Sequence, residues 1–247
     1  MQKYILSFIL LIQLLFSGSN YRLCYAFNYS KPFINDELNN DIQIKGLTNH
    51  SIGFSFDVSK VKFALMNYSS IFRAKFLLTG KSYEGIIEGN LDEIAEQQTI
   101  LSNQFIDSHI FLETDLSLPL QIPLSFLNSS NAGTLDFAVG YKFTIPIESY
   151  RYIDSEKYQL ISSCNEEDCI KSTINNNHGI ILSSTYSSPF KLAIGIEYFL
   201  GFRNIESAIS KSTNRSSKRI FGIDFINSDD NIYLLNRDLS FILTYQF

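Results

Sequence analysis

The sequence predicts an all-β protein, an eight-stranded antiparallel up-and-down transmembrane β-barrel with short periplasmic turns and long outer loops. Three observations predict it. Apolar and polar side chains alternate along most of the chain, and this period of two is typical of strands. The apolar faces of the expected strands contain no Lys, Arg, Asp or Glu. The connections between strands alternate between short and long, as they do in outer-membrane barrels.

The composition fits one barrel of this kind. The 247 residues allow a single all-β domain. Charged residues make up 18% of the chain, below the usual quarter, and 21 Phe and 14 Tyr accompany an absence of Trp. The net charge of −5 leaves no basic surplus to offset phosphates, so nucleic acid is excluded as a partner.

The N-terminus indicates secretion. We interpret residues 1–26 as a signal peptide, with Lys3 before an apolar run and a cleavage site after Ser19 or Ala26. The run is shorter than the roughly 20 residues of a spanning helix. Residues 27–49 show no sustained period and are expected to form a flexible lead-in. The barrel is then expected to occupy residues 50–247.

The barrel should be built from eight strands in chain order. A tight turn near Ser59 is expected to separate the first two, and a short helix is expected after Asn90, an N-cap. The expected strands are residues 51–58, 61–66, 72–79, 112–126, 135–148, 180–186, 191–203 and 238–247. The expected short turns are 67–70, 128–131 and 187–189, and the expected long connections are 81–109, 149–177 and 206–235.

Charged side chains gather on the polar faces of these strands. A Lys or Arg facing lipid at mid-depth costs about 2–4 kcal/mol, so these groups should point into the barrel and pair there. Eight strands leave only enough interior for side chains, so a packed lumen without an open pore is expected. The polar faces carry Asp57, Lys62, Glu148 and Asp238, together with the ion-pair candidates Arg73, Lys75, Glu113, Asp115, Asp136, Lys142, Lys191, Glu197 and Arg203.

The cysteines suggest one bridge and no metal. Cys164 and Cys169 bracket a four-residue acidic loop and could close as a disulfide in an oxidising compartment. Cys24 would leave with the signal if cleavage followed Ala26. Two cysteines do not supply the four ligands of a zinc site, so neither a metal nor a cofactor is expected.

Four segments carry a family resemblance. Leu120 to Leu124 (LQIPL), Gly133 to Ile147, Gly201 to Ile205 (GFRNI) and the aromatic C-terminus resemble the small outer-membrane β-barrel family. Within it they are similar to PorT-like barrel domains of OmpA/OmpX size. The resemblance covers residues 50–247.

The resemblance implies a Gram-negative outer membrane, contact with its lipid, and insertion by the barrel-assembly machinery. That machinery reads a C-terminal aromatic strand, which here would be Phe241, Leu243, Tyr245 and Phe247. The resemblance implies no single activity.

Four functional classes remain open. We expect a non-enzymatic structural or surface-interaction protein that meets envelope proteins through its long loops. A component of a secretion or envelope-assembly machine, as the PorT resemblance suggests, is the first alternative. A lipid-acting enzyme at the rim would use His178 with Ser183 or Ser184, although spacing identifies no group to orient the base. A soluble lipocalin-like barrel would turn its apolar faces inward.

Overall fold

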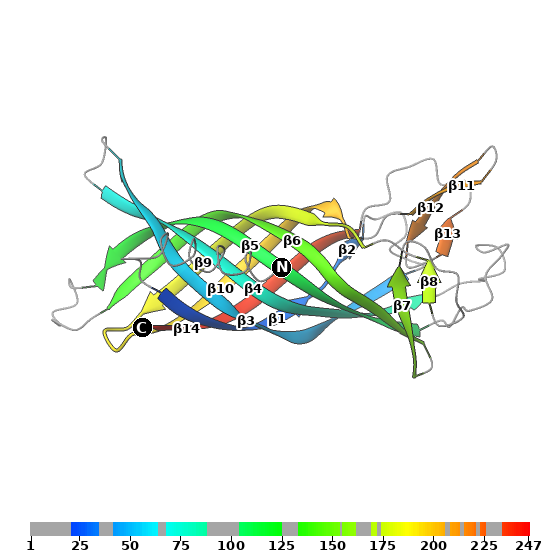
Figure 1. The fold of residues 1–247 in the computed structure, drawn as a ribbon, viewed down its shortest axis with the longest axis horizontal. Coiled ribbons are helices and arrows are strands. Elements are labelled where there is room, and N and C mark those ends of the chain that lie inside the picture. Colours follow the sequence, from blue (N-terminus) through cyan, green and yellow to red (C-terminus); the bar gives the residue numbers. More distant parts are fainter. Residues whose placement is uncertain are drawn as a thin grey trace, which may run out of the picture.

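The computed structural model contains a closed barrel (Figure 1). Within its described residues, eight strands pair in a ring in which every neighbouring pair is antiparallel. The structure describes residues 21–34, 42–63, 68–87, 104–124, 133–153, 155–161, 169–171, 174–205, 208–212, 215–220, 223–225 and 234–247. None of these residues forms a helix long and apolar enough to cross a membrane.

The ring follows chain order, so the topology is up-and-down as predicted. The last ring strand pairs with the first, which leaves no free sheet edge. In ring order the strands are β1 (Tyr21–Ser30), β3 (Ile42–Phe63), β4 (Tyr68–Ile87), β5 (Gln104–Pro123), β6 (Thr134–Ile153), β9 (Asn177–Ser187), β10 (Leu192–Asn204) and β14 (Leu234–Gln246).

The two ends of the barrel differ. The C-terminus, the start of β1 and the connections 64–67, 125–132 and 188–191 lie at one end, here called the turn end. The other, the loop end, carries the longer connections 31–41, 88–103, 154–176 and 205–233 (Figure 1). Six short strands occur in these longer connections: β2 (Phe33–Ile34), β7 (Glu156–Ile161), β8 (Cys169–Lys171), β11 (Ala208–Ser212), β12 (Arg215–Ile220) and β13 (Ile223–Phe225).

The prediction of a flexible lead-in at 27–49 was wrong, because this segment supplies parts of two ring strands. β1 pairs with β14 from Arg22 to Ser30 and with β3 from Tyr21 to Ser30. Its side chains alternate cleanly between exposed and buried. The apolar signal-like run directly before β1 obscured this alternation in the sequence.

The turn expected near Ser59 was also wrong. β3 is one continuous strand of 22 residues, and at the expected turn its pairing with β4 shifts register between Asp57 and Ser59 without reversing the chain; another shift lies between Gly46 and Ser51. A β-bulge of this kind inserts a residue and interrupts the alternation without reversing the chain. The predicted count of eight was therefore reached by splitting β3 in two and omitting β1.

Several long strands extend beyond their predicted limits. β4 continues to Ile87 and β5 begins at Gln104, so the predicted 81–109 connection is much shorter. The β5–β6 pairing also shifts register, between Ile110 and Phe111, and this shift leaves Ile147 as an extra residue in β6. Glu148 is consequently exposed, although simple alternation placed it inside. The helix expected after Asn90 lies outside the described residues.

Candidate functional site: outer wall and lumen

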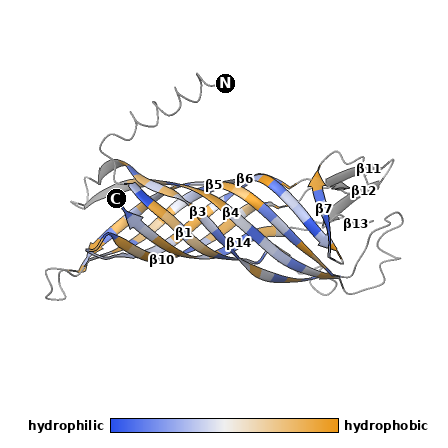
Figure 2. Ribbon diagram, turned by 60° about the horizontal axis from the view of Figure 1, so that its bottom comes forward, coloured by the Kyte–Doolittle hydropathy of each residue, from blue (hydrophilic) through white to orange (hydrophobic). Residues whose placement is uncertain are grey.

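The outer wall of the ring is apolar. Figure 2 shows hydrophobic and hydrophilic residues alternating along the barrel strands. The apolar members point outward, opposite to the arrangement of a lipocalin-like barrel. Outward side chains between 40% and 60% exposed include Leu23, Phe27, Ile52, Phe54, Leu78, Leu116, Leu120, Val139, Tyr141, Ile194, Ile196 and Phe241.

The predicted assembly strand belongs to this wall. Phe241, Leu243, Tyr245 and Phe247 are all exposed on the outside of β14, and Tyr245 and Phe247 meet edge to face. Ser240, before Phe241, and Thr244, between Leu243 and Tyr245, are buried on the inner face. Ile242 stands on that inner face and lines a lumenal cavity.

The wall becomes polar toward the loop end. The exposed residues in the middle of β3 are Ile52 and Phe54. Nearer the loop end the exposed residues of this strand are Thr48, Lys45 and Gln43. Here Lys45 Nζ lies 3.3 Å from a carboxylate oxygen of Glu84. The hydrogen bond from Gln104 and the charge of Lys45 hold the pKa of the Glu84 carboxyl below its ordinary value. A defined apolar band thus ends in a solvated rim.

The middle of the lumen is crossed by a continuous chain of seven charged side chains. In order of contact they are Asp115, Lys75, Glu197, Lys142, Glu113, Lys81 and Asp238. Each lysine touches two carboxylates, with Nζ–O distances that include 2.9 Å for Lys75–Asp115 and 2.6 Å for Lys142–Glu197. All seven are at most 8% exposed, so the chain is buried.

These charges come from many strands of the ring. β4 supplies Lys75 and Lys81, β5 supplies Glu113 and Asp115, and β6, β10 and β14 supply one group each. The ion pairs therefore connect walls that are distant in sequence, such as Lys81 and Asp238. Lys81 Nζ also lies 5.1 Å from the ring centre of Phe111 and 5.3 Å from that of Phe199.

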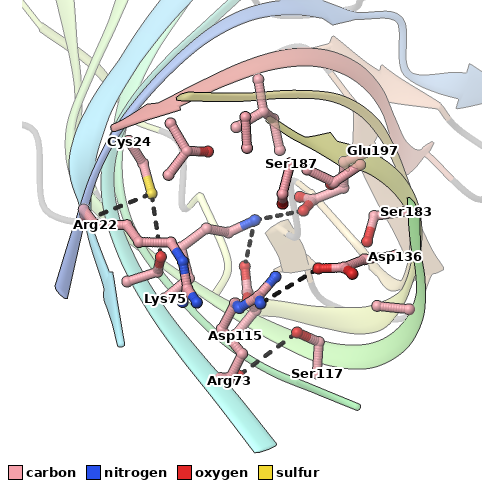
Figure 3. A pocket seen from close by; sticks show the side chains of 16 residues that line it. Arg22, Cys24, Arg73, Lys75, Asp115, Ser117, Asp136, Ser183, Ser187 and Glu197 are labelled. Carbon is pink, nitrogen blue, oxygen red and sulfur yellow. Dashed lines mark hydrogen bonds and ion pairs between the residues drawn. The ribbon is translucent and has the colours of Figure 1, made fainter. Parts of the chain in front are cut away.

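A second charged group lies toward the turn end. Asp57 accepts two hydrogen bonds from Arg22, at 2.8 and 2.9 Å, and a third from Arg73 at 3.4 Å. Arg73 also reaches Asp136 at 3.5 Å. Figure 3 shows Arg22, Arg73 and Asp136 around a small cavity of about 50 Å³. Lys75, Asp115 and Glu197 of the central chain also line this cavity, together with small side chains such as Ser117 and Ser183. Since one water occupies about 30 Å³ in the liquid, the cavity has room for little more than solvent.

The lumen toward the loop end is filled by aromatic rings and one ion pair. Arg151 donates two hydrogen bonds of 2.7 Å to Asp107, and its guanidinium carbon lies 4.4 Å from the ring centre of Phe105. Tyr83 and His109 are each 1% exposed, and the Tyr83 hydroxyl lies 3.1 Å from Nε2 of His109.

Seven of the nine ion-pair candidates lie in the lumenal groups just described. Lys191 and Arg203 do not. Lys191 is exposed in the turn before β10, with a positive φ of 66°, and Arg203 is exposed near the end of β10 toward the loops. Four charged lumenal residues were not predicted: Arg22, Lys81, Asp107 and Arg151. Asp57 and Asp238 were predicted to lie on a polar face but were not named as ion-pair candidates.

The other predicted sites contribute little chemistry. Cys24, expected to leave with a signal cleaved after Ala26, is 2% exposed and contacts Ser55 Oγ at 3.4 Å. Cys164 and the side chain of Cys169 lie outside the described residues. In the part of the chain that the structure describes, no group of His, Cys, Asp and Glu could hold a metal ion.

Comparison with solved structures finds distant similarities to three proteins. Neisserial surface protein A is similar at 8% identity and a TM-score of 0.43, covering 94% of this chain and 100% of that one. The outer membrane protein OprG from Pseudomonas aeruginosa is similar at 10% identity and a TM-score of 0.41, and the match covers 93% of this chain and 96% of OprG. The transport unit of the autotransporter AIDA-I from Escherichia coli is similar at 11% identity and a TM-score of 0.39, and the match covers 92% of this chain and 90% of that unit. No protein-family model and no curated protein matches the chain.

The fold class rests on the molecule's own ring and wall. A barrel without edges satisfies every backbone group of its wall internally, as hydrocarbon requires. Antiparallel barrels with an even strand number, short turns at one end and an apolar outer band are the fold of bacterial outer-membrane proteins. This chain has the fold of an outer-membrane β-barrel.

Proposed function

We propose that this protein is a non-enzymatic outer-membrane barrel with an ion-tight interior, which serves a structural or surface-interaction role through its loop end. The observation that carries the proposal is the seven-membered chain of ion pairs across the lumen. A solute would have to break several buried pairs to pass, and each broken pair leaves a buried charge without its partner.

The loop end favours surface interaction over a purely structural role. Strands β7 and β8 prolong the sheet beyond β6, and β11, β12 and β13 form a separate three-stranded sheet. Connections with secondary structure of their own are more elaborate than closing a barrel requires, and long loops commonly carry function.

Conductance in planar bilayers tests the closed interior. We expect the reconstituted barrel to show no stable pore conductance at neutral pH. A variant that combines Lys142→Ala with Glu197→Ala should show leak events, because it removes the centre of the chain while keeping the charge balance. A steady open state of the unaltered protein would contradict the proposal.

A place in a secretion or envelope-assembly machine is the second candidate, and the additional strands at the loop end favour it equally. Cross-linking in native membranes separates the two. A complex of fixed stoichiometry with other envelope proteins would support the machine, whereas a barrel recovered by itself would support the first proposal.

The contacts of His178 do not support a rim enzyme. Its Nδ1 lies 2.5 Å from the Tyr141 hydroxyl and its ring meets Phe202, while Ser183 lines the lumenal cavity. No hydrogen bond between His178 and either Ser183 or Ser184 occurs among the described contacts.

A further inference from the structure

The two halves of the lumen differ in how far solvent reaches them. On β9 the inward residues Asn177 and Ile181 are 2% and 1% exposed, whereas Ser183, Thr185 and Ser187, nearer the turn end, are partly exposed. All five belong to the same face of one strand, so the difference reflects their depth in the lumen and not their orientation. Solvent therefore reaches the lumen from the turn end.

Aromatic side chains close the half of the lumen toward the loop end. Tyr83, Phe111 and Phe199 are at most 2% exposed. The Nζ atoms of Lys81 and Lys142 each lie 5.3 Å from the ring centre of Phe199, so this aromatic plug packs directly on the central chain of ion pairs. Water that entered from the loop end would have to pass these rings.

The turn-end half keeps space because its wall is made largely of small side chains. With the inward Ser and Thr residues of β9, Ala138 of β6 and Ala193 of β10 line the cavity of about 50 Å³. The longer side chains of Arg22, Arg73 and Lys75 reach into it from β1 and β4 (Figure 3). A buried water needs two to four polar partners, and hydroxyls can both donate and accept hydrogen bonds. The lining thus suits water.

The charges near the mouth of this cavity are balanced. Arg22 and Arg73 are matched by Asp57 and Asp136, with which they form ion pairs. The side chains of Arg22, Asp57 and Arg73 are 11–16% exposed, so solvent reaches them while the central chain beyond is more deeply buried. A lining with equal numbers of cations and anions favours neutral guests over ions of either sign.

We propose that the turn-end half of the lumen is a dead-end vestibule, which takes up water and neutral molecules of similar size and ends at Lys75, Asp115 and Glu197. Short turns face the periplasm in outer-membrane barrels. The vestibule therefore connects the central ion pairs with periplasmic solvent, and the aromatic plug separates them from the outside. The proposal rests on the closed interior proposed above, because an open pore would make both halves accessible.

Thiol labelling of the full chain in nanodiscs compares the two halves. In a background with Cys24→Ser, Cys164→Ser and Cys169→Ser, a single thiol is introduced by Ser183→Cys in the vestibule or by Thr144→Cys beyond the central chain. Both changes replace a hydroxyl with a thiol. Methyl methanethiosulfonate is small and neutral, and it should modify Ser183→Cys at least about tenfold faster than Thr144→Cys, because thiol exchange depends on access. Mass spectrometry measures the modified fraction.

The outcomes separate the vestibule from the closed interior. Equal resistance of both thiols, in a protein that shows no conductance, would overturn the vestibule alone. Equally fast labelling of both thiols would overturn the aromatic plug, and a conducting protein would then overturn the closed interior as well.

A substitution at the mouth identifies the entrance. Ser187 is the last residue of β9 and lines the cavity. Ser187→Phe should slow the labelling of Ser183→Cys toward the rate of Thr144→Cys, because the ring obstructs the approach from the turn end. Phe190→Ala, in the exposed turn that follows, is the control and should leave the rate unchanged. Heat-modifiability in SDS gels shows whether each variant has folded. Undiminished labelling in the folded Ser187→Phe variant would contradict an entrance at the turn end.

Discussion

At the scale of residues, the lumen is stabilised by shared charges. Each lysine of the central chain bridges two carboxylates, so no pair is independent of its neighbours. Buried pairs of this kind add little net stability when they form, but breaking one is expensive. The three lysines and four carboxylates are therefore expected to respond to substitution as one network.

Lys142 lies at the centre of that network and gives the sharpest residue-level prediction. Lys142→Met should destabilise the barrel by about 3–5 kcal/mol, because Glu113 and Glu197 are both buried and each loses a cation. Urea unfolding from lipid vesicles, followed by gel mobility without boiling, measures the loss. Adding Glu197→Gln should recover part of it. The exposed Lys191→Met is the matched control, and an equal effect at both positions would refute the lumenal assignment.

The sequence could identify lumenal charges only where alternation is clean. Lys75 and Glu197 stand between apolar neighbours and Asp115 precedes Leu116, and all three were recognised. Toward the loop end the inner face is itself aromatic, with Tyr83, Phe105 and Phe111 pointing inward, so apolar and polar residues no longer separate by face. Lys81, Asp107 and Arg151 were missed for that reason, and the extra residue at Ile147 moved Glu148 outside.

At the scale of elements, β1 is the ring strand that is hardest to recognise from the sequence. Its apolar outward face continues the signal-like run, yet its backbone closes the ring between β14 and β3. Cleavage after Ala26 would remove six of its ten residues, whereas cleavage after Ser19 leaves the whole strand.

We therefore predict a mature protein that begins at Asn20. N-terminal sequencing of the protein purified from membranes tests this directly. A chain that starts at Asn28 should fail to become heat-modifiable, because an open ring exposes unpaired backbone groups to lipid. Efficient folding of that shortened chain would show that β1 is not part of the barrel.

β10 offers a test of which face of a strand meets lipid. Ile194 is 59% exposed on the outside, so Ile194→Arg should cost about 2–4 kcal/mol and block assembly. Lys191→Gln, only three residues earlier but in the exposed turn, should be mild. Membrane fractionation with heat-modifiability compares the two variants, and equal tolerance at both positions would be inconsistent with the outward face.

At the scale of the whole molecule, the fold class was predictable because lipid imposes a simple requirement. Every outward position of a spanning strand must be apolar, and this produces long alternating segments that survive in a single sequence. The bulges were not predictable, since they depend on pairing between strands. The predicted antiparallel barrel was confirmed, but the predicted set of strands was not, because the omission of β1 and the division of β3 compensated for each other in the count.

The central claim is that the apolar side of each strand faces acyl chains and the charged side faces the lumen. Because the chain contains no Trp, single tryptophans are clean reporters. Val139 is 59% exposed on the outside of β6, and Ser183 lies on the lumenal face of β9. The two positions are at nearly the same height in the barrel, because Val139 pairs with Leu182, the residue before Ser183. Both variants are first checked for folding by heat-modifiability.

The decisive measurement is quenching of Val139→Trp and Ser183→Trp fluorescence by lipids brominated in their acyl chains. The barrel described here predicts strong quenching for Val139→Trp and little for Ser183→Trp. Unquenched fluorescence from Val139→Trp in the folded, reconstituted protein would contradict it.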